Sequence, residues 1–255
     1  MKREMEVCVL SDIELGVPGS NPLELLNYLK GIQPNLLILS GSVVNNRQFG
    51  KRYFSRKTLM IIQQIMQMAL QGCKVVVITG SGSTELKRFA GVNLGNIHLR
   101  EEMTFKLQGK EYLIFNAPEK RKRKKWLNFI QKLFSIFRRD SDLYESSTRE
   151  NSSENFYSLS LKKAFEKKSD AMIVQQNNSG GISTVDFKGR KIEIYHPGNW
   201  FENLSSLEYS KGIWELYQFN ELDFGLRNPK LEVKDSDKNV PDEVVLIREP
   251  LQFRV

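Results

Sequence analysis

The sequence is poor in cysteine and has no long hydrophobic run. Its two cysteines, Cys8 and Cys73, each lie in an apolar, strand-like stretch, where a thiol usually packs as a small buried hydrophobe. Two cysteines in 255 residues build no disulfide framework, so we expect both to be reduced, as in a cytoplasmic protein. The apolar run nearest the N-terminus, Val7 to Leu10, is too short for a signal peptide or a membrane-spanning helix.

Positive charge is concentrated in one segment of the chain. The net charge is +8, and Lys120 to Arg139 contains nine Lys or Arg and no acid, so the remaining residues together carry −1. A protein that presents a broad basic face to nucleic acid would spread this charge more widely, so nucleic acid is not the favoured partner. With 40% hydrophobic residues, the chain is long enough for one globular domain with insertions.

Strand-like and helical patterns alternate in the first part of the chain. Residues 22–32 and 58–72 are apolar at a spacing of 3.6 residues, which predicts two helices. Five apolar runs predict strands, and each ends in small or polar residues: EVCVLSD, NLLILSGS, KVVVITGSGS, EYLIFNAP and DAMIVQQNNSGG. This alternation predicts a largely parallel sheet covered by helices, with ligand sites at the carboxyl ends of the strands.

One predicted strand runs into a small, glycine-containing loop, GSGST, at residues 80–84. This loop alone is compatible with a dinucleotide-binding loop, an ordinary tight turn, or the strand-end loop of another class of enzyme. It lacks the third glycine of a dinucleotide fingerprint and the lysine of a P-loop. The local pattern therefore does not favour nucleotide binding, and a plain turn is the simplest interpretation.

Three longer stretches follow one another in the order SDIELGVPGS, LKRFAGVNLGNIHL and YHPGNWFENLSSLEYSKGIWELYQF. Together with the five strand ends, they resemble the calcineurin-like metallophosphoesterases, specifically the UDP-2,3-diacylglucosamine diphosphatase branch of lipid A synthesis. The resemblance extends over residues 6–219. It implies an α/β fold, a metallophosphoesterase-like four-layer α/β/β/α sandwich with a helical cap insertion. The implied domains are a core at 1–118 and 170–222, a basic cap at 119–169 and a charged tail at 223–255.

The resemblance also implies two divalent metals, held by Asp, His and Asn side chains, that activate a water and clamp a phosphate. This sequence keeps Asp12 but has Glu14 in place of the His of the D-x-H motif. The other positions carry residues without charge: Ser42 for the bridging Asp, Asn45 for a second Asp, Ser81 for the metal-binding Asn, Gly82 for the catalytic His, and Asn116, Gln176 and Asn178 at further ligand positions. Neutral oxygens bind dications weakly, so we expect no paired metal site and no catalytic residue.

Asp12 and Glu14 leave two interpretations open. They could hold one weakly bound Mg or Ca ion, helped by neutral oxygens of Ser42 or Asn178. Alternatively, they accept hydrogen bonds from loop amides at the end of the strand. We expect no further cofactor, and we expect both His98 and His196 to be hydrogen-bonding residues rather than ligands or catalysts.

The basic segment, Lys120 to Arg139, combines basic residues with a predicted apolar helix face. Its apolar residues recur at helical spacing directly after six consecutive basic residues, which is typical of a helix that lies at an anionic membrane surface. A cap helix packed on its own domain and a nucleic-acid contact are the alternatives. The residues predicted to contact membrane or lipid are Lys120, Arg121, Lys122, Arg123, Lys124, Lys125, Trp126, Ile130, Leu133 and Phe137.

Taken together, the sequence predicts a catalytically inactive relative of the lipid A diphosphatase. We expect it to be cytoplasmic, peripheral to the inner membrane, and to act as a binding or regulatory protein. The alternative is a phosphodiester or pyrophosphate hydrolase, acting on a lipid A precursor or a similar substrate through a single-metal site at Asp12 and Glu14. The tail after residue 222 contains one late apolar run, EVVLI, and is predicted to add an edge strand or to bind a protein partner.

Overall fold

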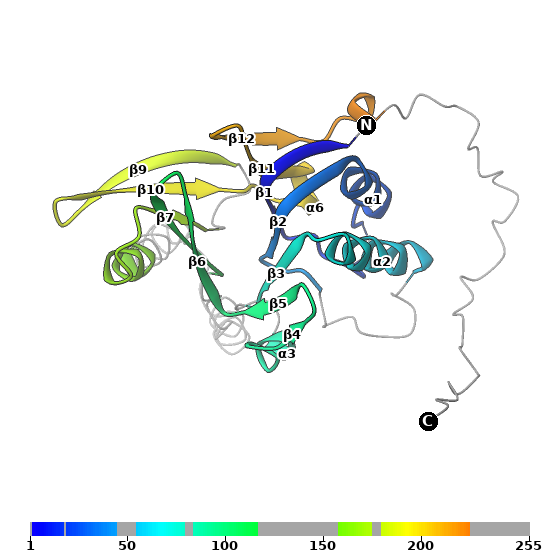
Figure 1. Ribbon diagram of the computed structural model, residues 1–255, viewed down its shortest axis with the longest axis horizontal. Coiled ribbons are helices and arrows are strands. Elements are labelled where there is room, and N and C mark those ends of the chain that lie inside the picture. The colour runs from blue at the N-terminus through cyan, green and yellow to red at the C-terminus, as the bar shows by residue number, and fades with distance from the viewer. Residues whose placement is uncertain are drawn as a thin grey trace, which may run out of the picture.

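A computed structural model describes residues 2–17, 19–44, 55–79, 84–116, 158–174 and 180–224 (Figure 1). These residues form two β-sheets with helices on their outer faces. The basic segment and the charged tail lie outside the described residues, as do parts of three strand-end loops.

The first sheet has seven strands, in the order β12-β11-β1-β2-β3-β5-β4. Its central strands β1, β2, β3 and β5 are parallel, while β11, β12 and β4 run antiparallel to their neighbours. The strands, in chain order, are β1 (Arg3–Ser11), β2 (Ile32–Ser40), β3 (Lys74–Ile78), β4 (Asn93–Leu94), β5 (Ile97–Arg100), β11 (Ser205–Ser210) and β12 (Ile213–Gln218).

The second sheet has five strands, in the order β6-β7-β8-β10-β9. Strands β7, β8 and β10 are parallel, and the outer strands β6 and β9 are antiparallel to their neighbours. The strands are β6 (Glu102–Leu107), β7 (Lys110–Phe115), β8 (Ala171–Ile173), β9 (Gly181–Phe187) and β10 (Arg190–His196).

Helices cover both outer faces. Helix α1 (Pro22–Gly31) begins with a proline, whose fixed φ suits the first turn, and α2 (Arg56–Leu70) is capped by Ser55, whose side chain accepts the Thr58 N–H at 3.2 Å. Residues 158–166 form a helix on the second sheet. Three short helices are α3 (Thr84–Lys87), α6 (Trp200–Asn203) and η2 (Glu221–Phe224).

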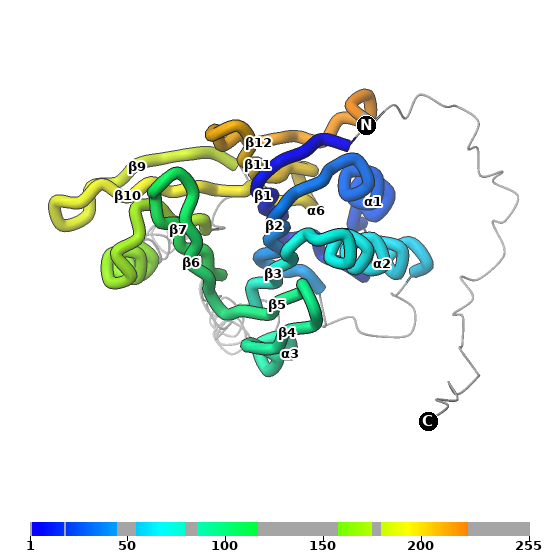
Figure 2. The backbone as a smooth tube through the Cα atoms, in the orientation of Figure 1, coloured from blue at the N-terminus to red at the C-terminus, as the bar shows by residue number. Residues whose placement is uncertain are grey.

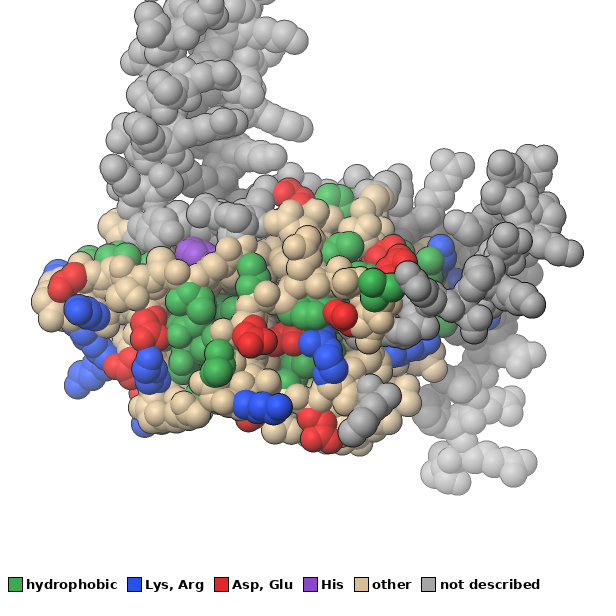
Figure 3. All heavy atoms as spheres, turned by 90° about the horizontal axis from the view of Figure 1, so that it is seen from above, with side chains coloured by type: hydrophobic (Ala, Val, Ile, Leu, Met, Phe, Trp, Pro, Cys, Tyr) green, Lys and Arg blue, Asp and Glu red, His purple; other side chains and the backbone are tan. Residues whose placement is uncertain are grey.

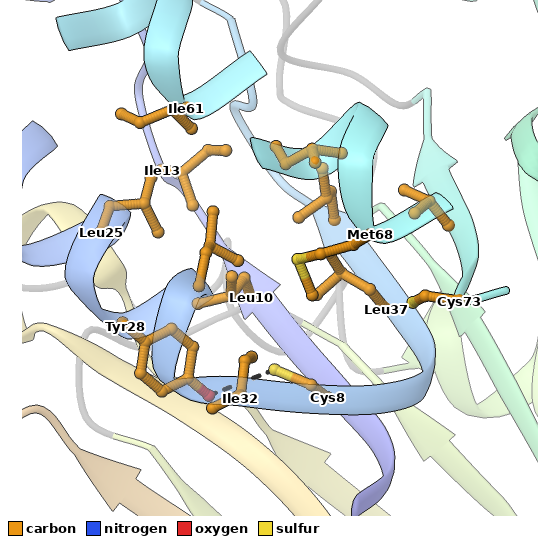
Figure 4. Close-up of a cluster of buried hydrophobic side chains, with 14 of the residues drawn as sticks. Cys8, Leu10, Ile13, Leu25, Tyr28, Ile32, Leu37, Ile61, Met68 and Cys73 are labelled. Atoms are coloured by element: carbon orange, nitrogen blue, oxygen red, sulfur yellow. Dashed lines mark hydrogen bonds between the residues drawn. The ribbon is translucent and has the colours of Figure 1, made fainter. Parts of the chain in front are cut away.

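Three clusters of buried side chains separate four layers. The first lies between α1, α2 and the first sheet, where Leu25, Ile61 and Met68 of the helices face Leu10 and Leu37 of the strands (Figure 4). The second joins the two sheets, and the third lies between the second sheet and the helix at 158–166. This arrangement confirms the four-layer α/β/β/α sandwich that the resemblance implied.

Most of the predicted elements are present. All five predicted strands and both predicted helices form, and the parallel pairing holds for the centre of each sheet. Cys8 and Cys73 are buried free thiols, as expected. Residues 158–166, within the predicted cap segment, pack Leu161 and Ala164 onto the second sheet, so this part of the segment contributes to the core.

A buried carboxylate ties the N-terminus to the end of the domain. Glu208 accepts two hydrogen bonds from the Arg3 guanidinium, at 2.9 and 3.0 Å, and one from the Tyr28 hydroxyl at 2.6 Å. The Tyr28 oxygen also lies 2.7 Å from Ser206 Oγ and 3.2 Å from the thiol of Cys8. Burial raises the pKa of Tyr28 well above its usual value, so the hydroxyl stays protonated as a donor.

We expect Tyr28→Phe to lower the free energy of unfolding by about 2 kcal/mol, because it removes a donor from a buried, charged acceptor. Urea denaturation at pH 7 measures this difference. The matched control is Tyr217→Phe. The Tyr217 hydroxyl donates to Asp223 at 2.6 Å at an exposed position, so its removal should lower the free energy of unfolding by no more than about 0.5 kcal/mol. Equal effects of the two substitutions would contradict the importance of the Glu208 network.

Candidate functional site

The carboxyl ends of four strands meet at one end of the sandwich. Asp12 follows β1, Gly41 and Ser42 follow β2, and Asn116 follows β7 of the second sheet. Hydrogen bonds join these residues to one another and to Ile78, the last residue of β3. The structure thus brings together the predicted site residues that it describes at this end: Asp12, Glu14, Ser42 and Asn116.

Asp12 is held by backbone groups on both sides. Its Oδ1 accepts the Ser42 N–H at 2.6 Å, and its own N–H donates to the Ser40 carbonyl at 3.1 Å. Glu14 continues the contact, because its N–H donates to the Ser42 carbonyl at 3.0 Å. The interpretation that loop amides bond to Asp12 therefore holds for one of its carboxylate oxygens.

The backbone at this strand end is unusual. Asp12 and Glu14 both have positive φ, 50° and 46°, which costs a residue with a side chain about 1 kcal/mol or more. Ile13, which lies between them, is 2% exposed and belongs to the first core cluster. The left-handed residues thus flank a core residue, and the carboxyl groups lie on a segment that core packing and the β2 loop hold in place.

Acidic neighbours share the environment of Asp12. Burial is the main cause that raises the pKa of Asp12, the Ser42 N–H opposes the shift, and the charges of Glu14 and Glu202 add to it, so that the pKa lies at about 6. Glu202 comes from α6, near the other end of the chain. A carboxyl group with this pKa is partly protonated near neutral pH, and a bound cation would favour its ionised form.

Asn116 joins the two sheets. Its Oδ1 accepts the Gly41 N–H at 2.8 Å, and its Nδ2 donates to the Ile78 carbonyl at 2.7 Å. A second contact runs from Nδ2 to the Gly41 carbonyl at 3.4 Å. Both ends of the amide are therefore engaged by backbone groups of the first sheet.

The remaining predicted site residues are not described. Ser81 and Gly82 of the GSGST loop, Asn45, Gln176 and Asn178 lie outside the described residues. The predicted membrane-contacting set lies outside them too: Lys120, Arg121, Lys122, Arg123, Lys124, Lys125, Trp126, Ile130, Leu133 and Phe137.

Both histidines make hydrogen bonds. His196, at the end of β10, is 6% exposed, and its Nδ1 lies 3.0 Å from the Val174 carbonyl; burial lowers its pKa. His98, on β5, has its Nδ1 2.9 Å from Asn93 Oδ1. The structural roles expected from the sequence agree with these contacts.

Sequence reasoning missed the residues that place α6 over the β1 end. The Phe201 N–H donates to the Asp12 carbonyl at 3.1 Å, and Asn21 Nδ2 donates to the Phe201 carbonyl at 3.1 Å. Asn21 precedes a helix that starts with proline, so it would be taken for a helix cap, yet its side chain makes no capping bond. The bond depends on a partner 180 residues away, which no local pattern shows.

The described donors do not fit a two-metal centre. Such a centre needs a carboxylate that bridges the two ions, and position 42 carries a serine whose backbone N–H is bonded to Asp12. The Asn116 oxygen already accepts the Gly41 N–H. Asp12, with its second oxygen, and Glu14 fit at most one weakly held, oxygen-seeking cation.

The described part of the chain shows neither a cluster of metal-binding side chains nor a membrane-spanning helix. It contains no group of three or more His, Cys, Asp or Glu side chains placed to hold a metal ion. No helix among these residues is long and apolar enough to span a bilayer.

Comparison with known proteins returned solved structures alone, since neither a protein-family model nor a curated protein matches the sequence. A hypothetical protein of Pyrococcus horikoshii OT3 is 11% identical, over 87% of this chain and 91% of that one, with a TM-score of 0.44. Vps29 of Chaetomium thermophilum is 10% identical, over 84% and 86%, with a TM-score of 0.43. An archaeal phosphodiesterase is 9% identical, over 84% and 99%, with a TM-score of 0.41.

We expect Asp12→Asn to remove a pH dependence of stability. Because the pKa of Asp12 is about 6 in the folded chain, above its usual value, the stabilisation from its bound proton is present below pH 4 and lost as the pH rises through 6. Asparagine keeps an acceptor for the Ser42 N–H and does not ionise. At pH 7.5 the variant should exceed the parent in free energy of unfolding by about 1 to 3 kcal/mol, with the difference shrinking at pH 4.

Urea denaturation at the two pH values measures this difference. The control is Asp186→Asn, which changes an exposed carboxylate that likewise accepts a backbone N–H, from Gly189 at 3.0 Å. A difference between Asp12→Asn and the parent that stays constant from pH 4 to 7.5 would rule out the effect of burial on Asp12.

Proposed function

We propose that this chain is a metallophosphoesterase-like protein without phosphoesterase activity, related to the UDP-2,3-diacylglucosamine diphosphatases, that binds at an anionic membrane surface. The observation that carries the first half is the use of Asn116 as a joint between the sheets. A side chain at a ligand position, bonded at both ends to the backbone, contributes to folding rather than to holding a dication.

The neighbouring positions support the same proposal. A phosphoesterase of this type needs a bridging carboxylate to hold two dications and an imidazole to assist the reaction. The corresponding positions carry Ser42 and Gly82, which have neither group. The Ser42 N–H moreover occupies one oxygen of Asp12, the ligand that the sequence retains.

The second half rests on charge and apolar pattern. The chain outside Lys120 to Arg139 has a net charge of −1, so nine basic residues in this segment carry the positive character of the protein. Trp126, Ile130, Leu133 and Phe137 recur at helical spacing directly after six of them. Anionic lipid attracts the basic residues, and the membrane–water interface buries the apolar residues. Electrostatic attraction and apolar burial would therefore both favour binding of this segment.

A second candidate function is hydrolysis of a phosphodiester or pyrophosphate with one metal ion. The retention of Asp12 and Glu14 at one strand end favours it, because a bound cation would offset the negative charge that Glu14 and Glu202 place near Asp12. The cation would be held by Asp12 and Glu14 and would supply Lewis-acid activation of a phosphate.

Assay of the purified chain separates the two candidates. The substrates are UDP-diacylglucosamine and a chromogenic phosphodiester, with added Mn²⁺ or Mg²⁺. We expect hydrolysis no faster than the rate in buffer without protein, because the groups that would activate water and clamp phosphate are replaced. Metal content of the purified protein is measured in parallel. Asp12→Ala is the control: metal-dependent turnover that disappears in this variant would establish the hydrolase instead.

Vesicle co-sedimentation tests the membrane half. We expect binding to vesicles that contain anionic lipid, weakened by salt, because each Lys or Arg near such a surface contributes about 1 kcal/mol. Trp126→Ala combined with Phe137→Ala should weaken binding through the apolar term. The matched control is Phe89→Ala, which removes an aromatic side chain that is 53% exposed on the described surface and should leave binding unchanged. Equal binding to neutral and anionic vesicles, or none at low salt, would refute this half.

A further inference from the structure

The edge strands of the two sheets lie at the same rim of the sandwich. Strand β12 ends the first sheet and β9 ends the second, and among the described strands each pairs with one neighbour. The tube in Figure 2 shows them along the same side. They approach closely at one point, where a side chain added to Gly180, just before β9, would collide with Leu216 of β12.

Strand β12 exposes apolar side chains on both of its faces. Trp214 and Leu216 are two residues apart, so both lie on the face between the sheets, where Leu216 is 44% exposed. Ile213 lies on the helix-covered face and is 60% exposed. Ile182 of β9, which is 54% exposed, adds to the inter-sheet side. Figure 3 views this rim and shows apolar side chains gathered between charged ones.

An edge of this kind is normally protected. A strand with an unpaired row of N–H and C=O groups and exposed apolar side chains is a template for another strand. Natural proteins cover such edges or place charges and prolines on them. Strand β12 has one acidic residue, Glu215, and no proline, so the edge is open to pairing.

We propose that residues 242–249 of the same chain add to β12 as an edge strand. The chain continues for 31 residues after Phe224, the end of η2, and η2 follows β12 after two residues and contacts α1. The tail therefore leaves the domain beside the edge that it would cover.

The composition of residues 242–249, DEVVLIRE, fits a strand at this position. Four consecutive apolar residues, Val244 to Ile247, present two side chains to each face of a strand, as required to cover both Leu216 and Ile213. Pro241 and Pro250 bound the segment, and proline is tolerated at the ends of strands. The charged residues at its two ends would protect the new edge.

The connection is long enough and favours intramolecular pairing. Residues 225–241 give a linker of 17 residues, whose root-mean-square reach as a flexible chain would be about 23 Å. Six residues of β12 extend about 20 Å, so the apolar run reaches either end of the strand. A linker of this length gives an effective concentration on the order of millimolar, well above that of a second copy in dilute solution.

Hydrogen exchange of the full chain at low micromolar concentration tests the proposal. In the parent, the β12 amides that point away from β11 should be protected, and Val245→Asp should speed their exchange at least tenfold by placing a charge against the edge. The matched control, Val240→Asp, makes the same change outside the apolar run and should have no effect. The amides of β1 and β2 report whether the variants remain folded.

A peptide of residues 239–255, added to the Val245→Asp chain, should restore protection of β12. The same exchange rates in the parent and in Val245→Asp would overturn the proposal. So would protection that rises with protein concentration together with a doubled mass in solution, because a second copy would then be the occupant.

Discussion

The side chain of Asn116 joins the two sheets at the end of the sandwich where β2, β3 and β7 finish. The apolar cluster between the sheets attracts them without directional preference. Hydrogen bonds from Asn116 to Gly41 and Ile78 add direction, because they require β7 to end opposite the ends of β2 and β3. The same bonds satisfy backbone groups that the parallel strands leave without partners where their ladders stop. This joint fixes the end of β7 against the ends of β2 and β3.

This joint and a metal site compete for the same atoms. A dication at this position would need a free ligand atom from residue 116, but the Asn116 Oδ1 accepts the Gly41 N–H and its Nδ2 donates to the Ile78 carbonyl. The Ser42 N–H makes a similar use of Asp12. The polar groups described at these strand ends are therefore used for hydrogen bonds between strands. Burial is the main cause of the raised pKa of Asp12, and the charges of Glu14 and Glu202 add to it.

Local patterns in the sequence predict the elements whose apolar residues follow a regular pattern. Strand β3 and helix α2 follow from an apolar run and from a helical repeat. The closing strands and the polar joints depend on distant partners: Val7 pairs with Tyr209, and Tyr28 donates to Glu208 across 180 positions. Glu208 in the sequence looks like a solvent-facing residue of a strand. The role of Asn116 depends on backbone atoms of two other strands, so its residue type alone gives no indication of it.

Under the proposed function, charge also sets how the domain would meet a membrane. The end of β1 carries the carboxylates of Asp12 and Glu14, and Glu202 of α6 acts on Asp12 through its charge. The basic segment begins at Lys120, four residues after Asn116. An anionic surface repels those carboxylates within a screening length of about 8 Å and attracts the basic residues. The orientation of lowest electrostatic energy therefore places Lys120 to Arg139 on the lipid and keeps the strand ends away from it. The same carboxylates would also repel a ligand that carries phosphate. The basic segment, rather than the strand ends, is therefore the place that favours anionic ligands.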